Sequence, residues 1–357
     1  MSLGQCNPQA KILWHLDKVN EWNNTGNVFP ILFEIDPTNK CNHDCPWCSF
    51  SKWRSENEDS LCINTLKILL HNLKKGGTKA INWTGGGEPL MNRNTIEAIL
   101  YANEIGFDQG IFTNGALLND TKSDILSKCM TWIRISLDAY DGASYAKSHG
   151  TYDGAFKKII DNISNICRKH NRCTVGVGFV INESNYEGIE IISKIIKDVG
   201  ADYIQFKPEI RRPGNSQVSP EFFRDKVFPL LDKASLLSDN KFNVMITKYR
   251  FDDVLSPETN FGRNYNKCYS HNFQGAIAAD GKVYVCDHHK GEKDYEIGDI
   301  KKNSIIEIWK SNKRKDVISY LDSTDLSQCQ ICCRNHELNK FLWHIKNVDK
   351  RMHPNHV

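Results

Sequence analysis

The stretch ILFEIDPTNKCNHDCPWCSF, residues 31–50, joins a short apolar run to three closely spaced cysteines. Residues 31–36 are rich in branched and aromatic side chains, which predicts a buried strand. Cys41, Cys45 and Cys48 follow in a C-x3-C-x2-C pattern on the loop after that strand. In parallel α/β folds, ligand-binding groups gather at the carboxyl ends of the strands. The stretch therefore predicts a metal-binding loop at the carboxyl edge of a parallel sheet.

Beyond this loop, short apolar runs alternate with longer stretches of helical periodicity. Further strands are predicted at residues 80–84, 110–113, 132–137, 174–181 and 203–208. Helices are predicted at residues 61–75, 94–105, 121–129, 153–170 and 185–199. Strands separated by helices of this length form βαβ crossovers and hence a parallel sheet covered by helices. The spacing allows either a partial barrel of six units or a doubly wound sheet.

The pattern changes after residue 210. Residues 208–221 contain three prolines and a glycine, which predicts a linker. The stretch GAIAADGKVYVC, residues 275–286, predicts a hairpin around Asp280 and Gly281, and helices are expected at 304–311 and 337–348. We therefore divide the chain into an N-terminal extension (1–30), a main α/β domain (31–210), and a linker with a small C-terminal α+β domain (211–357).

Composition and charge argue against some kinds of binding partner and some cellular locations. The chain has 357 residues and a formal net charge of only +3, which argues against a nucleic-acid partner. Its apolar runs fall far short of the roughly 20 residues of a membrane span. The first residues do not resemble a secretion signal, so we expect a cytoplasmic protein without membrane contact.

Thirteen cysteines in a reducing compartment are more often metal ligands or catalytic groups than disulfides. Seven of them fall into two spaced sets. The remaining six are interpreted as small apolar residues: Cys6, Cys62, Cys129, Cys167, Cys173 and Cys333.

Spacing alone leaves two metals open for the first cysteine set. Zinc favours four protein ligands, and His43 would have to fold back tightly to supply the fourth. Three thiolates suit a four-iron cluster that leaves one iron open to a small molecule. The spacing favours iron–sulfur over zinc.

The segment WTGGGEPL, residues 83–90, follows the second predicted strand. Its three glycines permit close backbone approach to a ligand, and Glu88 adds a negative charge beside carbonyls that can accept from an ammonium group. An ordinary glycine-rich turn is the alternative. A phosphate loop is disfavoured because no Lys-Ser/Thr pair follows the glycines.

Together, the cysteine pattern and the GGGEP segment resemble the radical S-adenosylmethionine (SAM) enzymes. The resemblance extends over residues 30–210 and includes TNG (113–115), RISLD (134–138) and VINESN (180–185) at strand ends. It implies a partial (β/α)6 barrel in which the three cysteines hold a [4Fe–4S] cluster and SAM chelates the open iron. It also implies SAM contacts from Trp47, Gly85, Gly86, Gly87, Glu88, Ser136 and Asn182.

The second cysteine set resembles the twitch domain, a shortened SPASM domain that binds one auxiliary [4Fe–4S] cluster. Its implied ligands are Cys268, Cys286, Cys329 and Cys332, with Cys333 able to replace Cys332. Leu338 stands where a full SPASM domain has a further cysteine, which indicates a single auxiliary cluster. Zinc is the alternative metal. His336 is interpreted as a helix-cap or surface residue. Asp287, His288 and His289 are interpreted as a solvated hairpin end, or else as groups that tune the second cluster or bind substrate.

The resemblance implies reductive cleavage of SAM, with electrons from a flavodoxin or ferredoxin-type reductant, and hydrogen abstraction by a 5′-deoxyadenosyl radical. The cysteine spacing resembles that of twitch-domain dehydrogenases that oxidise an aminocyclitol. Our leading hypothesis is therefore a radical SAM oxidoreductase that oxidises a hydroxyl of a small-molecule sugar or cyclitol to a ketone, with the auxiliary cluster as electron acceptor. Candidate catalytic groups near the sixth strand and before the second cysteine set are Lys207, Glu209, Arg211 and Arg250.

Two other functions stay open. A peptide-modifying maturase is the first, although only 30 residues precede the first predicted strand, too few for a leader-binding domain. The second is a non-enzymatic metal-binding or RNA-binding module, which would leave the GGGEP segment unexplained.

Overall fold

The computed structural model describes most of the chain. The described residues are 11–169, 173–210, 218–255, 263, 265–326, 329, 333–348 and 351.

A single curved sheet of ten strands runs through the molecule, in the order β10-β9-β8-β1-β2-β3-β4-β5-β6-β7. The strands are β1 (Leu32–Ile35), β2 (Ala80–Trp83), β3 (Asp108–Thr113), β4 (Trp132–Ser136), β5 (Thr174–Ile181), β6 (Tyr203–Pro208), β7 (Asn243–Ile246), β8 (Gln274–Ile277), β9 (Lys282–Tyr284) and β10 (Glu296–Asp299). Strands β1 to β6 lie in sequence order and are all parallel, as expected for consecutive βαβ crossovers. The six predicted strands are therefore confirmed.

The sheet continues on both sides of these six strands. β7 was not predicted. It lies after residue 210 in the sequence and pairs parallel to β6. β8 pairs parallel to β1, and the predicted hairpin β8–β9 continues the same sheet toward β10. Within the described residues, β7 and β10 are the two edges, so the barrel is open. The α/β class with a partial parallel barrel is confirmed, and the C-terminal hairpin is built onto that barrel's own sheet.

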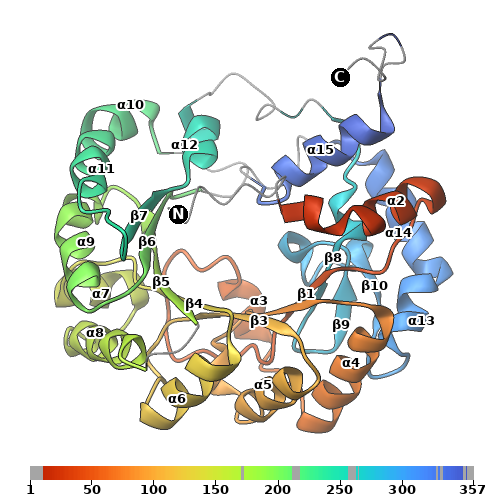
Figure 1. The fold of residues 1–357 in the computed structure, drawn as a ribbon, viewed down its shortest axis with the longest axis horizontal. Helices are drawn as coiled ribbons and strands as arrows, with labels where there is room; N and C mark the ends of the chain where they lie inside the picture. The colour runs from red at the N-terminus through yellow and green to blue at the C-terminus, as the bar shows by residue number, and fades with distance from the viewer. Residues whose placement is uncertain are drawn as a thin grey trace.

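Most helices lie on the convex side of the sheet, whereas α3 (Ser51–Glu56), on the loop after β1, lies inside its curve (Figure 1). Those of the main domain besides α3 are α4 (Ile63–Gly76), α5 (Thr95–Glu104), α6 (Asp120–Cys129), α7 (Gly142–His149), α8 (Gly154–Cys167) and α9 (Ile189–Asp198). The others are α2 (Leu16–Thr25), α10 (Pro220–Phe222), α11 (Phe228–Ser235), α12 (Lys248–Leu255), α13 (Ile305–Lys310), α14 (Asn312–Ser323) and α15 (His336–Lys346). Each helix predicted from periodicity is present within a few residues of its expected ends, while α7 was not predicted.

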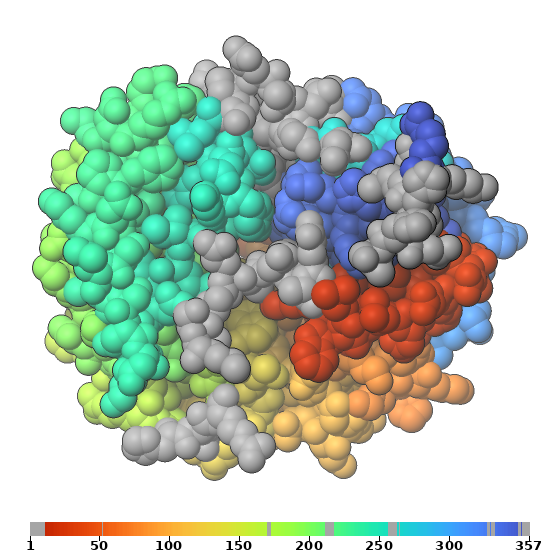
Figure 2. Space-filling model, turned by 45° about the horizontal axis from the view of Figure 1, so that its top comes forward, coloured from red at the N-terminus to blue at the C-terminus, as the bar shows by residue number. Residues whose placement is uncertain are grey.

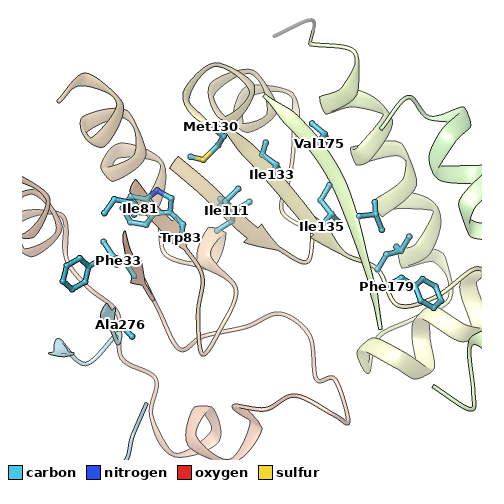
Figure 3. Close-up of a cluster of buried hydrophobic side chains, with 14 of the residues drawn as sticks. Phe33, Ile81, Trp83, Ile111, Met130, Ile133, Ile135, Val175, Phe179 and Ala276 are labelled. Atoms are coloured by element: carbon cyan, nitrogen blue, oxygen red, sulfur yellow. The ribbon is translucent and has the colours of Figure 1, made fainter. Parts of the chain in front are cut away.

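Alternation along the strands separates an apolar outer face from a polar inner face. Ile133 and Ile135 of β4 and Phe179 of β5 are fully buried under the outer helices, and they belong to the cluster in Figure 3. Successive strand residues point to opposite faces. Arg134 on β4 and Lys207 on β6 therefore lie on the inner face, where both are partly exposed. This inner face is where a substrate can meet polar side chains.

The two ends of the described chain pack together. Trp22 of α2 and Leu342 of α15 are buried in one small apolar cluster with Phe273. The Lys346 ammonium donates to the backbone oxygen of Asn23 at 2.6 Å. Figure 2 shows the red N-terminal helix beside the blue C-terminal one. The N-terminal segment thus covers the region that carries the second cysteine set.

Candidate functional site

The first cysteine set lies on the loop after β1, where Cys41, Cys45 and Cys48 are all partly buried. The Cys48 amide donates to the Cys45 carbonyl at 3.1 Å, which makes a tight turn between the two thiols. Burial raises the pKa of Cys41, and burial together with Asp138 and the other two thiols raises that of Cys45 to about 12. The thiols lie within electrostatic range of one another, so a bound cation would favour their thiolate forms.

The glycine segment packs directly against the residues that precede Cys41. The amides of Gly87 and Glu88 donate to the carbonyls of Thr38 (3.2 Å) and Lys40 (2.9 Å). A methyl group on Gly87 would lie 2.1 Å from the Lys40 oxygen, and one on Gly86 would lie 2.7 Å from Asn39. Glycine is therefore required because two backbone segments meet here, and the contact places the glycine loop beside the cysteine loop.

Glu88 is buried and engaged with protein donors. Its carboxylate accepts from the Thr113 hydroxyl (2.8 Å) and from the amides of Leu90 (3.1 Å) and Asn114 (2.8 Å). The Asn114 side chain in turn donates to Asn42 at 2.9 Å. Glu88 thus ties the loop after β3 to the cysteine loop, a role that its sequence position did not reveal.

A second set of potential ligands surrounds Cys45. The His149 ring lies with Nδ1 3.3 Å from the Cys45 sulfur and Nε2 2.7 Å from the Leu137 carbonyl. Because a carbonyl only accepts, Nε2 carries the proton of the neutral ring and Nδ1 presents its lone pair to Cys45. His43 completes a group of three whose ligand atoms lie within 4.8 Å of one another, and its buried Nδ1 has no hydrogen-bond partner among the described residues. Burial lowers the pKa of both histidines to about 4, so both are neutral at pH 7.

The other expected SAM contacts lie at the same edge of the sheet. Trp47 is partly exposed on the cysteine loop, and Ser136 is the partly exposed last residue of β4. Asn182 is buried directly after β5, where its side-chain oxygen accepts from the amide (2.9 Å) and the hydroxyl (2.7 Å) of Ser184. The structure therefore brings these residues to one edge, while the Asn182 side-chain carbonyl is used within its own turn.

Three of the candidate catalytic residues, Lys207, Glu209 and Arg250, lie on or beside β6. Lys207 lies on the inner face of β6, and burial together with Arg134 and Arg250 lowers the pKa of its ammonium well below its usual value. The Glu209 amide donates to the Ile181 carbonyl at 2.8 Å just past β6, and Arg250 lies on α12, which packs beside β6. Arg211 is outside the described residues.

The second cysteine set lines a cavity in the C-terminal region. Four thiols face it, those of Cys268, Cys286, Cys329 and Cys333, and burial raises the pKa of the last three. Cys332, which the sequence analysis preferred as the fourth ligand, is outside the described residues.

Hydrogen-bond donors already point at two of these sulfurs. The Asn339 amide group donates to Cys268 at 3.4 Å, and the backbone amide of Asn335 donates to Cys333 at 3.4 Å. Asn339 is held in place because its oxygen accepts from the backbone amides of Tyr269 and Ser270. Such donors stabilise thiolates and are typical of ligand sulfurs in metal centres.

His336 is not a surface residue as expected, because it begins α15 with only 7% of its surface exposed. Its Nδ1 lies 3.0 Å from the hydroxyl of Tyr265, which lines the same cavity. The preceding residue, Asn335, occupies the cap position. The histidine therefore belongs to the wall that supports the second thiol set.

Buried ion pairs connect the two cysteine regions. Lys290 donates to both oxygens of Asp36 (2.9 and 2.7 Å) and lies 2.7 Å from Asp287, which follows Cys286. Arg334, which follows Cys333, pairs with Glu34 at 2.5 Å and with Asp287 at 3.4 Å. Asp36 also accepts from the Gly86 amide at 3.2 Å.

Burial and the neighbouring cations Lys290 and Arg334 together set the pKa values of the carboxylates in this network. Burial raises the pKa of Asp36 to about 6, against the pull of Lys290. Although burial acts to raise it, Lys290 and Arg334 hold the pKa of Asp287 well below its usual range. Asp287 is therefore a partly buried ion held by two cations, not part of a solvated hairpin end. The sequence analysis missed this network, whose one visible signal was the pair of acidic residues, Glu34 and Asp36, in an otherwise apolar strand.

Comparison with protein families now accounts for both thiol sets. The family model of the radical SAM superfamily matches residues 35–195, and that of the SPASM iron–sulfur cluster-binding domain matches residues 268–334. Residues 35–195 thus form a radical SAM domain. The chain carries a SPASM domain after the barrel, so the resemblance seen in the cysteine and GGGEP patterns is confirmed.

Curated relatives of this radical SAM protein are distant and chemically diverse. The tungsten-containing aldehyde ferredoxin oxidoreductase cofactor-modifying protein of Pyrococcus furiosus is 21% identical over 298 residues, covering 78% of this chain and 80% of that protein. The radical SAM cyclopropyl synthase TigE of Paramaledivibacter caminithermalis is 25% identical over 287 residues, covering 72% and 57%.

Solved structures show the same fold over most of the chain. SuiB of Streptococcus suis bound to S-adenosylmethionine superposes with a TM-score of 0.67 at 16% identity, covering 90% of this chain and 75% of SuiB. The enzyme anSMEcpe with bound AdoMet and a Cp18Cys peptide gives a TM-score of 0.61 at 17% identity, covering 87% and 88%. In the part of the chain that is described, the helices lack the length and apolar character of a membrane span.

The two domains imply a SAM-binding [4Fe–4S] cluster and an auxiliary iron–sulfur cluster. The donor sets fit both groups: three thiols on the first loop leave a fourth coordination position to another ligand, and four thiols around one cavity make a closed set. The glycine loop packs against the residues before Cys41, which places its backbone beside the first thiol set. The protein is thus a radical SAM enzyme with SPASM-type metal binding.

Proposed function

We propose that this radical SAM enzyme modifies a peptide. The observation that carries the proposal is the shared fold with SuiB and anSMEcpe, whose structures include a bound precursor peptide, SuiA, and a bound Cp18Cys peptide. The open barrel is consistent with such a substrate, because an extended chain can enter a sheet that is not closed on itself. The oxidation of a sugar or cyclitol hydroxyl has less support, since the curated relatives include synthases, cyclases and a cofactor-modifying protein.

The first site holds the reactive group. In our proposal, Cys41, Cys45 and Cys48 ligate the cluster, and the glycine loop with Trp47, Ser136 and Asn182 contacts SAM. When bound, this pair supplies a 5′-deoxyadenosyl radical that removes a hydrogen atom from the substrate. Glu88 keeps the loop after β3 against the cysteine loop through its bonds to Thr113 and Asn114.

The second site holds the auxiliary cluster. We assign its ligands as Cys268, Cys286, Cys329 and Cys333, because these four thiols share one cavity. This assignment replaces our preference for Cys332. The ion pairs of Lys290 and Arg334 then keep the cluster in a constant position relative to the glycine loop.

Anaerobic turnover tests the proposal. The protein would be reconstituted with iron and sulfide and incubated with SAM, dithionite and synthetic peptides encoded by short reading frames next to its gene. Aminocyclitols and sugars would be assayed in parallel, and a C41A/C45A/C48A variant would serve as the control. Peptide-dependent 5′-deoxyadenosine together with a mass change in the peptide supports the proposal. Turnover with sugars or cyclitols alone overturns it and restores the dehydrogenase hypothesis.

A further inference from the structure

Three side chains of metal-ligating type meet where the end of α7 packs against the cysteine loop. His43, Cys45 and His149 each place one ligand atom within 4.8 Å of the others, and both histidines are buried. The His149 Nδ1 lies 3.3 Å from the Cys45 sulfur. In a tetrahedral zinc site, bonds of about 2.3 Å to sulfur and about 2.0 Å to nitrogen place those two ligand atoms about 3.5 Å apart. The observed pair therefore already has the spacing that one zinc ion requires.

Backbone and ring contacts hold the two sides of this group together. The Asp44 amide donates to the His149 carbonyl at 3.0 Å, which ties the middle of the cysteine loop to the end of α7. Gly150 follows with φ +58°, and a Cβ atom there would lie 2.3 Å from the backbone oxygen of Asp44. The Tyr145 ring stacks on His149 with centroids 4.4 Å apart and meets His43 edge-on at 5.9 Å. Both imidazoles are thus positioned before any ion arrives, which lowers the entropy lost on binding.

The hydrogen bonds of the two histidines are those of metal ligands. The Leu137 carbonyl, 2.7 Å from His149 Nε2, can only accept, so Nε2 donates and Nδ1 presents its lone pair to the group. A carbonyl bound to the far nitrogen is the usual second contact of a zinc-binding imidazole. His43 has 6% of its surface exposed, and its buried Nδ1 lacks a hydrogen-bond partner among the described residues. A buried nitrogen left without a partner costs free energy, so His43 is available to a further ligand.

The charged groups beside the site are compatible with a divalent ion. Oδ2 of Asp138 lies 3.9 Å from Nε2 of His149, although two cations of the inner face also act on this carboxylate. Arg54 donates to a carbonyl of the cysteine loop at 2.7 Å and is paired with Asp44 at 3.3 Å. Zinc bound by a single thiolate keeps a net positive charge, which the Asp138 carboxylate attracts at this range.

We propose that the cluster-free protein binds one zinc ion through His43, Cys45 and His149, and that this ion and the first iron–sulfur cluster compete for Cys45. The Cys45 thiol releases its proton to solvent when its sulfur binds the ion, and water fills the fourth position. The same sulfur is the one assigned to the cluster together with Cys41 and Cys48, so the two occupants exclude each other. A chain that has taken up zinc cannot assemble the first cluster until the zinc leaves. This zinc site goes beyond the proposed function and is independent of which substrate the enzyme modifies.

X-ray absorption at the zinc edge tests the ligand set directly. The full-length protein, cleared of iron with a chelator under anaerobic conditions, would be loaded with one equivalent of zinc. A Cys268→Ser/Cys286→Ser background removes two thiols of the second set, which would otherwise offer zinc another site. The fine structure of the spectrum should show one sulfur and two imidazole ligands. Three sulfurs would mean that the cysteine loop binds zinc alone, and that result, or a failure to bind zinc, would overturn the proposal.

Variants in the same background identify the ligands one by one. His43→Phe and His149→Phe should each weaken zinc binding by at least about tenfold, measured by competition with a chromophoric chelator. Cys48→Ser is the matched control, because it removes a thiol of the same loop that is not one of the three ligands. Its zinc affinity should equal that of the parent. Circular dichroism would establish that each variant is folded, and the X-ray measurement on the parent needs no substitution at the site.

Cluster assembly tests the competition. In this background, zinc-free protein should take up about four iron atoms per chain on reconstitution, since only the first cluster can form. Zinc-loaded protein should take up far less iron, and removal of the zinc with a chelator should restore the uptake. Full cluster assembly with zinc still bound would refute the competition. Histidine variants that bind zinc as tightly as the parent, or a Cys48→Ser variant that loses it, would refute the ligand set.

Discussion

Lys290 offers the sharpest test of how the two cysteine regions are held together. Its ammonium lies 2.7 Å from Asp36 and 2.7 Å from Asp287, with 1% of the lysine side chain and none of the Asp36 side chain exposed. Lys290→Met removes the cation but preserves most of the side-chain volume. Asp287 keeps Arg334 at 3.4 Å, whereas Asp36 keeps only the Gly86 amide at 3.2 Å among the described residues. The orphaned charge is therefore Asp36.

The expected loss of stability follows from this geometry. Breaking a buried ion pair from one side costs about 3–5 kcal/mol, because the remaining charge stays desolvated. The free energy of unfolding of Lys290→Met should fall by about that amount at pH 8. The loss should shrink toward pH 5, since Asp36, whose pKa is about 6 even beside Lys290, is then protonated in both folded proteins. An Asp36→Asn/Lys290→Met double variant should recover about 2 kcal/mol or more, because its asparagine side chain carries no charge to desolvate.

Urea unfolding of the cluster-free protein, followed by tryptophan fluorescence at pH 5, 6, 7 and 8, measures these differences. Lys293→Met is the matched control, an exposed lysine three residues away, and should change stability by no more than about 0.5 kcal/mol. If Lys290→Met behaves like Lys293→Met, or if its effect does not depend on pH, the pairing of Lys290 with an ionised Asp36 is refuted.

Three further predictions concern the sites themselves. Gly87→Ala places a methyl group 2.1 Å from the Lys40 oxygen, so SAM affinity measured by equilibrium dialysis should fall at least about tenfold while the circular dichroism spectrum is retained. Cys333→Ser should lower the iron content of reconstituted protein from about eight toward about four per chain, whereas Cys332→Ser should keep about eight; the reverse pattern would refute our ligand assignment. Burial raises the pKa of Asp138 from 3.8 to about 6, so the folded protein retains a proton that the unfolded chain releases, and stability is lost as the pH rises from 4 to 6. Asp138→Asn should remove about 3 kcal/mol of that decline in urea titrations, and an unchanged pH profile would contradict the shift.

Local pattern was sufficient for most elements of the fold. Branched and aromatic runs located β1 to β6, and helical periodicity located the outer helices, because burial on one face leaves a period in the sequence. β7, Asn243–Ile246, was not predicted. α7 escaped because Gly142–His149 is rich in small and polar residues, and it is stabilised by a capping box at Asp141.

In the sites too, features formed by residues close together in the sequence could be predicted, and features formed by residues far apart could not. The spacing of Cys41, Cys45 and Cys48 is local, since three thiols within a few residues must share a loop, and together with the GGGEP segment it indicated the family. The reason for the glycines was different from the expected one: they permit contact with the Asn39–Lys40 backbone. The buried state of His336 also had no local signal, because its partner Tyr265 lies 71 residues earlier.

By itself, the sequence determined the parallel α/β class, the first thiol set and the radical SAM domain, since each depends on residues that are neighbours along the chain. Tertiary structure alone decided which thiols share a cavity, that β8 joins β1, and that Asp36 meets Lys290 across 254 positions and Glu34 meets Arg334 across 300. The physical reason is that a buried charge requires a partner but does not specify where in the chain that partner lies. Only the folded sheet, which brings its first strand against the C-terminal hairpin, makes that choice.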